Sequence, residues 1–136
     1  MTLHPSVLIT LRRDAVEDTD IRTRIASTVR RLGFDAAVAH DGREALAWVR
    51  ERSFAATFVE CGVEGEAGVE AWRAIQPHQG RRLVLMIREP DRALWFEALG
   101  RGVGAVLPLP PAERMVRAAL RAATGWDDCP EPVRRF

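Results

Sequence analysis

The chain has 136 residues, close to the size of one compact domain, so its sequence predicts a single hydrophobic core. Apolar residues make up 47% and charged residues 29% of the chain, the ordinary balance of a globular protein. A formal net charge of +1 excludes the strongly basic surface of most nucleic-acid-binding domains, and we expect no direct binding of DNA or RNA. Every apolar run is far shorter than the about 20 residues of a membrane span, so we expect no membrane association.

Five short apolar runs recur along the chain, and a segment with helical periodicity follows each one. Because the runs are continuous rather than alternating, they predict parallel strands that are covered on both faces. Strands that alternate with helices five times predict a (βα)5 α/β fold. The five runs are residues 7–11, 36–39, 56–59, 83–87 and 105–107.

The helices between these runs are marked by their start and stop signals. Gly33 follows a stripe of apolar residues at helical spacing, and predicts the end of the first helix. Asp41, with Glu44 three residues later, predicts the start of the second. We expect the third over 69–75, ending before Pro77. The fourth and fifth helices are expected over 91–101 and from Pro111 onward.

The end of the chain differs from the rest, because residues 126–136 have no periodicity. We therefore expect one domain over residues 1–125 and a C-terminal tail, or the start of a linker, over 126–136. Cys61 and Cys129 lie far apart in the sequence and outside any metal-ligand spacing. They predict two reduced thiols in a cytoplasmic protein that binds no metal.

Three stretches carry a likeness to a known family. Residues 20–46 have the layout of its first helix, second strand and second helix, and residues 60–68 have the spacing of its phosphorylation loop, including the glycine before the third helix. Residues 98–110 match its helix–glycine–strand stretch that ends in a lysine–proline pair. In order and spacing, the chain from residue 7 to about 123 resembles the receiver domain of bacterial response regulators. The resemblance implies a three-layer flavodoxin-like sandwich with a parallel five-stranded sheet of order 2-1-3-4-5.

A working receiver needs an aspartate nucleophile, further carboxylates for Mg²⁺, and a hydroxyl and a lysine for the phosphoryl oxygens. The resemblance places all five of these functions on residues that cannot perform them, so it implies a pseudo-receiver with no catalytic residue and no cofactor. Pro110, after the lysine position, is kept and implies the family's cis peptide. The changed positions are Leu11 and Arg12 (acidic pair), Glu60 (phosphoacceptor), Ile87 (hydroxyl) and Leu109 (lysine).

Glu60 is the one carboxylate expected at this edge of the sheet, together with Arg12 and Arg88. A divalent cation needs several oxygen ligands at one point, so an ion pair between Glu60 and one of these arginines is the better prediction. In this family a glutamate at the phosphoacceptor position is often a stand-in for the phosphorylated aspartate, which would hold the domain in one state. The alternative is a satisfied acid in a decayed site, and both interpretations stay open.

One further alternative is a conventional Mg²⁺-dependent phosphoacceptor. The connection between the first strand and the first helix is longer than in the family and contains Asp14, Glu17 and Asp18. These carboxylates could turn over the pocket and restore metal binding. A solvated loop with a helix cap explains the same residues.

Another alternative is a sensor of anions or nucleotides. Arginines that converge at the strand ends could bind a phosphate-bearing ligand. The sequence has no glycine-rich phosphate loop to support this function. The arginines concerned are Arg12, Arg13, Arg81, Arg82 and Arg88.

Leu94, Trp95 and Phe96 predict an interaction surface on the fourth helix. Successive helical residues point about 100° apart, so three large apolar residues in a row cannot all face one core. In receivers, the fourth helix, fifth strand and fifth helix form the usual partner and dimer surface, and Val106 stands where the family often has a switching aromatic. We expect a protein partner or a homodimer there. The alternative is that Trp95 fills space beside small neighbours such as Gly100 and Gly104.

The predicted function is a phosphorylation-independent signalling module, either alone or as the input domain of a larger transcriptional or ATPase regulator.

Overall fold

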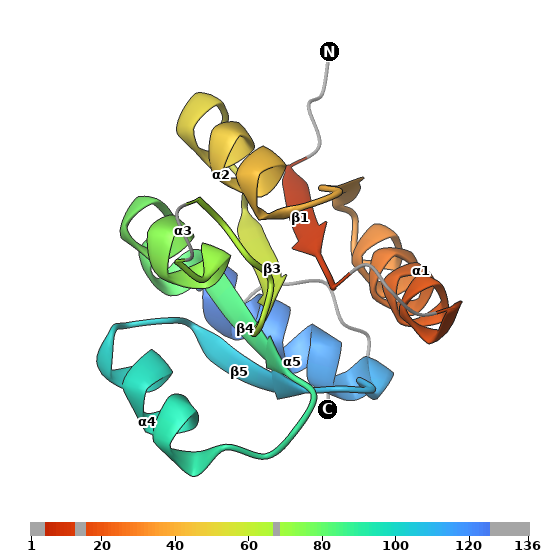
Figure 1. Ribbon diagram of the computed structural model, residues 1–136. Helices are drawn as coiled ribbons and strands as arrows, with labels where there is room; N and C mark the ends of the chain where they lie inside the picture. Colours follow the sequence, from red (N-terminus) through yellow and green to blue (C-terminus); the bar gives the residue numbers. More distant parts are fainter. Residues whose placement is uncertain (1–4, 13–15, 67–68, 126–136) are drawn as a thin grey trace.

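The computed structural model describes residues 5–12, 16–66 and 69–125 (Figure 1). Strands and helices alternate along these residues, as the apolar runs predict. The strands are β1 (Ser6–Thr10), β2 (Asp35–Val38), β3 (Ala56–Glu60), β4 (Leu83–Ile87) and β5 (Ala105–Pro108). The helices are α1 (Val16–Arg31), α2 (Gly42–Glu51), α3 (Ala71–Gln79), α4 (Arg92–Gly100) and α5 (Glu113–Thr124), with a 3-10 turn, η1 (Gly80–Arg82), before β4.

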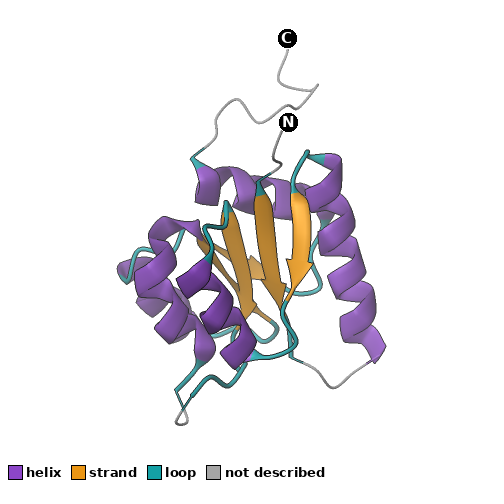
Figure 2. Ribbon diagram, turned by 90° about the horizontal axis from the view of Figure 1, so that it is seen from above, coloured by secondary structure: helices purple, strands orange, loops and turns teal. Residues whose placement is uncertain are grey.

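The strands form one parallel sheet with the order β2-β1-β3-β4-β5, which confirms the predicted topology. β3 is central and every one of its residues is buried, because helices cover both faces of the sheet (Figure 2). The carboxyl ends of parallel strands meet at one edge, where chemistry in such sheets gathers. Glu60, the last residue of β3, therefore reaches that edge beside the end of β4, since it lies in register with Met86.

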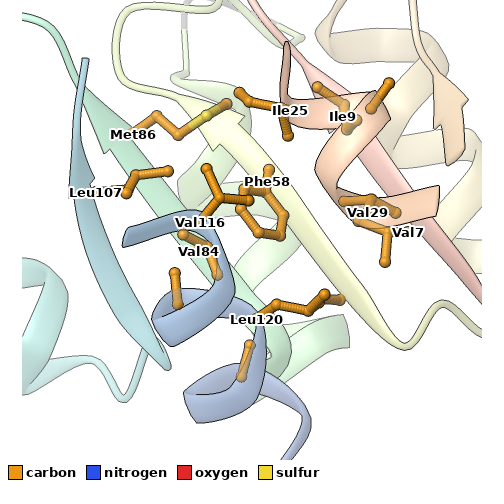
Figure 3. Close-up of a cluster of buried hydrophobic side chains, with 14 of the residues drawn as sticks. Val7, Ile9, Ile25, Val29, Phe58, Val84, Met86, Leu107, Val116 and Leu120 are labelled. Carbon is orange, nitrogen blue, oxygen red and sulfur yellow. The ribbon is translucent and has the colours of Figure 1, made fainter. Parts of the chain in front are cut away.

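The two faces of the sheet carry separate apolar cores. On one face, α1 and α5 pack against the strands, and Figure 3 shows Ile25, Val29, Val116 and Leu120 gathered around Phe58 of β3. On the other face, α2, α3 and α4 surround the fully buried Trp72. Both clusters draw on alternate residues of the same strands, as a doubly covered sheet requires.

The predicted helix ends are met at α2 and missed at α3 and α5. Asp41 caps α2 by accepting the N–H of Glu44 at 2.8 Å, as the capping-box pattern predicts. α3 does not end before Pro77 but continues to Gln79. Tertiary contacts hold its last turn, because the buried Gln79 amide oxygen accepts the Thr57 hydroxyl at 2.8 Å. Pro111, expected inside the first turn of α5, precedes the helix by two residues.

Three expectations concern residues outside the described ranges. The predicted tail, 126–136, is one, and Gly68 of the phosphorylation-loop pattern is another. Asp14 is the third, with the side chains of Glu17 and Asp18. Among the residues that are described, no helix combines the length and apolar character needed to cross a bilayer.

Candidate functional site

Glu60 lies at the centre of the strand-end edge, and its side chain has no exposed surface. The Arg88 guanidinium donates from Nε to Oε2 at 2.9 Å and from Nη2 to Oε1 at 3.0 Å. The backbone N–H of Arg12 donates to Oε1 at 3.1 Å. A buried carboxylate is costly unless it is paired and hydrogen-bonded, and a two-pronged guanidinium supplies both. The predicted ion pair of Glu60 is therefore present, with Arg88 as its partner.

Arg12, the other arginine expected to pair with Glu60, contacts it in a different way. Only its backbone contacts Glu60; its side chain is exposed and lies over Gly62, where an added Cβ would be 3.4 Å from the Arg12 Cδ. Arg12 and Gly62 both line two clefts at this edge, with volumes of about 380 and 260 Å³. The sequence could not separate Arg12 from Arg88, because both follow the end of a strand next to β3.

Three positions that carry polar groups in the family are filled by apolar side chains. Leu11 and Leu109 are 1% and 7% exposed and belong to the core beneath α1 and α5. Ile87 is 5% exposed and belongs to the core on the opposite face. The Leu109–Pro110 peptide is cis, as the resemblance implies. Three apolar side chains therefore stand at the strand ends where the family carries polar groups.

The loop after β3 is held by Glu70, a residue that the sequence analysis did not single out. Its Oε1 accepts the Gly62 N–H at 2.7 Å and the Cys61 thiol at 3.4 Å. Burial, followed by the hydrogen bond to Glu70 and its negative charge, raises the pKa of Cys61 to about 12. The thiol is therefore protonated near neutral pH and is a packed side chain rather than a reactive one.

The three consecutive apolar residues of α4 differ in their exposure. Leu94 is buried, whereas Trp95 and Phe96 are 39% and 68% exposed, and Leu99, which was not predicted, is 46% exposed. Trp95, Phe96 and Leu99, named here the α4 apolar face, line a cleft of about 440 Å³ with Ile87, Pro90 and Pro108. Val106, half-buried, packs against the core on this side of the sheet. Trp95 does not fill space beside Gly100 or Gly104: nothing lies within 4 Å of a Cβ added at Gly100, and the atoms nearest to one added at Gly104 belong to Arg81 and Ala123.

Of the five arginines considered for a nucleotide sensor, Arg12 and Arg88 line one cleft at the strand ends, and the two others that the structure describes lie elsewhere. Arg81 and Arg82 precede β4 and lie at the opposite edge of the sheet from Glu60. Arg81 donates to the carbonyl oxygen of Ala122 in α5, and Arg82 donates to the carbonyl oxygen of Phe54, just before β3. Both side chains therefore have structural partners at that edge. Arg13 lies outside the described residues. Within the ranges that the structure describes, no three His, Cys, Asp or Glu side chains come together as a metal site would require.

No protein-family model matches the sequence, and no curated protein sequence matches it at a significant level. The structure does match solved structures. The receiver domain of Francisella response regulator 1452 superposes with a TM-score of 0.71 at 18% identity, over 90% of this chain and 98% of that one. The chemotaxis response regulator CheY4 of Vibrio cholerae gives 0.68 at 18% identity, over 89% and 99%.

A sensor protein from Polaromonas sp. JS666 is similar at 25% identity, with a TM-score of 0.68 over 89% of this chain and 96% of that one. These likenesses cover nearly the whole of each known structure. The chain therefore has the fold of response-regulator receiver domains, as the sequence resemblance implied.

Proposed function

We propose that this chain is a pseudo-receiver, a cytoplasmic signalling module that works without phosphorylation and without catalysis, by contact with proteins. It acts alone or as the input domain of a larger transcriptional or ATPase regulator. The observation that carries the proposal is the Glu60 carboxylate, which is fully buried and already held by the Arg88 guanidinium.

Phosphoryl transfer depends on an accessible nucleophile and on positive charge that neutralises the moving phosphoryl group. The Glu60 side chain has no exposed surface, and the Arg88 guanidinium already donates two hydrogen bonds to its oxygens. Leu11, Ile87 and Leu109 are buried and offer neither an oxygen ligand for a metal ion nor an ammonium group. These features support a module that phosphorylation does not switch.

The position of the Glu60–Arg88 pair supports a stand-in for the phosphorylated state over a decayed relic. In an active receiver the phosphoryl group ties its loop to neighbouring strands through a lysine and a hydroxyl. Here the carboxylate at the end of β3 ties itself to the connection between β4 and α4, three residues before Asp91, the N-cap of α4. The pair would therefore fix the start of α4 permanently in one position.

The output surface in this proposal is the α4 apolar face, at the edge of the molecule beside β5 (Figure 1). Exposed aromatic side chains around a shallow apolar cleft are a common feature of protein-binding sites. The occupant is a protein partner or a second copy of the chain.

Incubation with acetyl phosphate and Mg²⁺, followed by intact-mass measurement, tests the central claim. We expect no gain of a phosphoryl group by the wild type, nor by Glu60→Asp, because the surrounding ligands are absent in both. A receiver domain with the full set of family residues serves as the positive control. A stable gain of one phosphoryl group by the wild type would refute phosphorylation independence.

Sedimentation tests the surface. If the chain self-associates, Phe96→Ala should weaken the association, whereas Val69→Ala, which shortens an exposed apolar side chain away from α4, should not. A wild type that stays monomeric at high concentration would eliminate the homodimer and leave another protein as the occupant.

A further inference from the structure

Four charged side chains of alternating sign run from α3 to α4. Arg73 contacts Glu70 through Nη1 and Oε2 at 3.3 Å, and donates to Glu97 from Nε at 3.0 Å and from Nη2 at 2.9 Å. Glu97 also accepts a hydrogen bond from the Arg101 Nε at 2.9 Å. Glu70, Arg73, Glu97 and Arg101 are named here the charge ladder. It joins the start of one helix to the end of the next.

The inner end of the charge ladder reaches the phosphoacceptor loop. The Oε1 atom of Glu70 accepts the backbone N–H of Gly62 at 2.7 Å, and Gly62 is two residues beyond Glu60. Gly62 has a positive φ of 97°, a conformation that other residues rarely adopt, so the loop geometry at this amide is specific. A displacement of this loop would therefore change the hydrogen bond to the Glu70 carboxylate directly.

The outer end of the charge ladder holds a helix that has little other anchorage. α4 buries only Leu94 and Ala98 among its described residues, fewer than the four side chains that α5 buries. The polar contacts between α3 and α4 therefore supplement a small buried apolar surface. Gln76 of α3 adds one more, donating from Nε2 to the Arg101 carbonyl at 2.6 Å.

The charge ladder has more directed contacts than an ordinary surface ion pair. Its central contact is two-pronged, and the Arg73 and Arg101 guanidiniums lie 5.1 and 5.7 Å from the centre of the buried Trp72 ring. Hydrogen bonding from Arg73 is the largest of the effects that lower the pKa of Glu97, and the same bond raises the pKa of Arg73. Exposed pairs without such geometry are worth little.

We propose that the charge ladder couples the loop after β3 to α4, so that the geometry of residues 61–63 and the placement of the α4 apolar face change together. In receivers a hydroxyl at the end of β4 and a switching aromatic on β5 lie beside α4; Ile87 and Val106 stand at these two positions in this chain. The biological use of the coupling rests on the proposed function, because only a partner that reads α4 gives it an output. The coupling itself is a property of the folded chain and is measured without a partner.

Amide hydrogen exchange and amide chemical shifts, recorded by NMR on the intact chain, test the coupling. Glu97→Gln removes a charge on α4, and we expect the Gly62 amide to shift and to exchange about three- to ten-fold faster, together with the amides of α4. Asp20→Asn is the matched control, since it removes the acid of an exposed i,i+4 pair on α1 and should leave Gly62 unchanged. A Gly62 amide that stays unchanged in Glu97→Gln, while α4 amides respond, overturns the coupling.

A double-mutant cycle sharpens the test. Glu70 and Glu97 share Arg73 as their partner, so the effects of Glu70→Gln and Glu97→Gln on exchange in α4 should fail to multiply if the ladder is one unit. Arg73→Lys keeps the charge but loses the two-pronged contact, and should reproduce most of the loss. Independent effects in the cycle contradict the proposal. Phosphorylation by acetyl phosphate would instead refute the proposed function and leave this result standing, so the two failures are distinguishable.

Discussion

Replacing Arg88 by methionine should destabilise the fold more than replacing Glu60 by glutamine, although each change breaks the same ion pair. The reason is the unequal burial of the partners. The Glu60 side chain has no exposed surface, whereas Arg88 retains 33% of its own. Arg88→Met leaves a buried carboxylate with only the Arg12 N–H as a donor. Glu60→Gln leaves a guanidinium that is already about one-third exposed.

The magnitudes follow from that difference. Removing one partner of a buried pair costs about 3–5 kcal/mol, and partial exposure of Arg88 moves the expectation for Arg88→Met to about 2–4 kcal/mol. Glu60→Gln keeps the shape and one acceptor oxygen, so about 1–2 kcal/mol is expected. Glu60→Leu combined with Arg88→Met should return to within about 1 kcal/mol of the wild type, because apolar replacement of both partners removes the uncompensated charge.

Urea unfolding followed by tryptophan fluorescence measures these differences as shifts in the free energy of unfolding. Arg24→Met, which removes an exposed pair with Asp20, is the matched control and should stay within about 0.5 kcal/mol of the wild type. If Arg88→Met is no more destabilising than Arg24→Met, the pair does not hold the strand ends together. An inverted order, with Glu60→Gln the more harmful change, would refute the argument from burial.

Two further predictions concern titrating groups. The pKa of Glu97 in the fold lies below its ordinary value of 4.5, so its ion pairs contribute stability that is fully present above that pH and is lost as the pH falls through the lower, folded pKa. Glu97→Gln should therefore flatten the acid limb of the stability curve in urea unfolding from about pH 6 to about pH 3, and an unchanged slope would contradict it. In a Cys129→Ser background, Cys61, with a pKa of about 12, should be alkylated by iodoacetamide at pH 8 some hundred- to thousand-fold more slowly than a free thiol. A native rate equal to the unfolded rate would refute its protection.

Most of the fold could be predicted because its signals are local and repeated. Continuous apolar runs, the Asp41–Glu44 cap and glycines at helix ends determine where strands and helices lie. The errors fall where distant contacts override local preference. α3 continues beyond Pro77 because Gln79 is hydrogen-bonded to Thr57 on β3. The sequence of the helix contains no pattern that predicts this bond.

The candidate site could be predicted only in part. Glu60 and Arg88 were found because both follow parallel strands and must meet at one edge. The charge ladder was missed, since Glu70, Arg73 and Glu97 meet across two helices whose relative placement no spacing in the sequence specifies. Leu99 was not predicted to be exposed for a simpler reason. It lies one turn after Trp95 on α4, outside the run of three consecutive apolar residues.

The changes at the strand ends are consistent with one another in physical terms. Leu11, Ile87 and Leu109 place buried apolar side chains at the strand ends, and a buried charge is costly without a partner. A lone Glu60 in that setting would be strongly destabilising, and Arg88 offsets its charge with two directed hydrogen bonds. Full burial of the Glu60 side chain strengthens the Glu60–Arg88 pair, because electrostatic attraction grows as solvent is excluded. A phosphoryl group must reach its carboxylate from solvent, whereas a permanent ion pair is best served by a buried carboxylate, and the Glu60 side chain is buried.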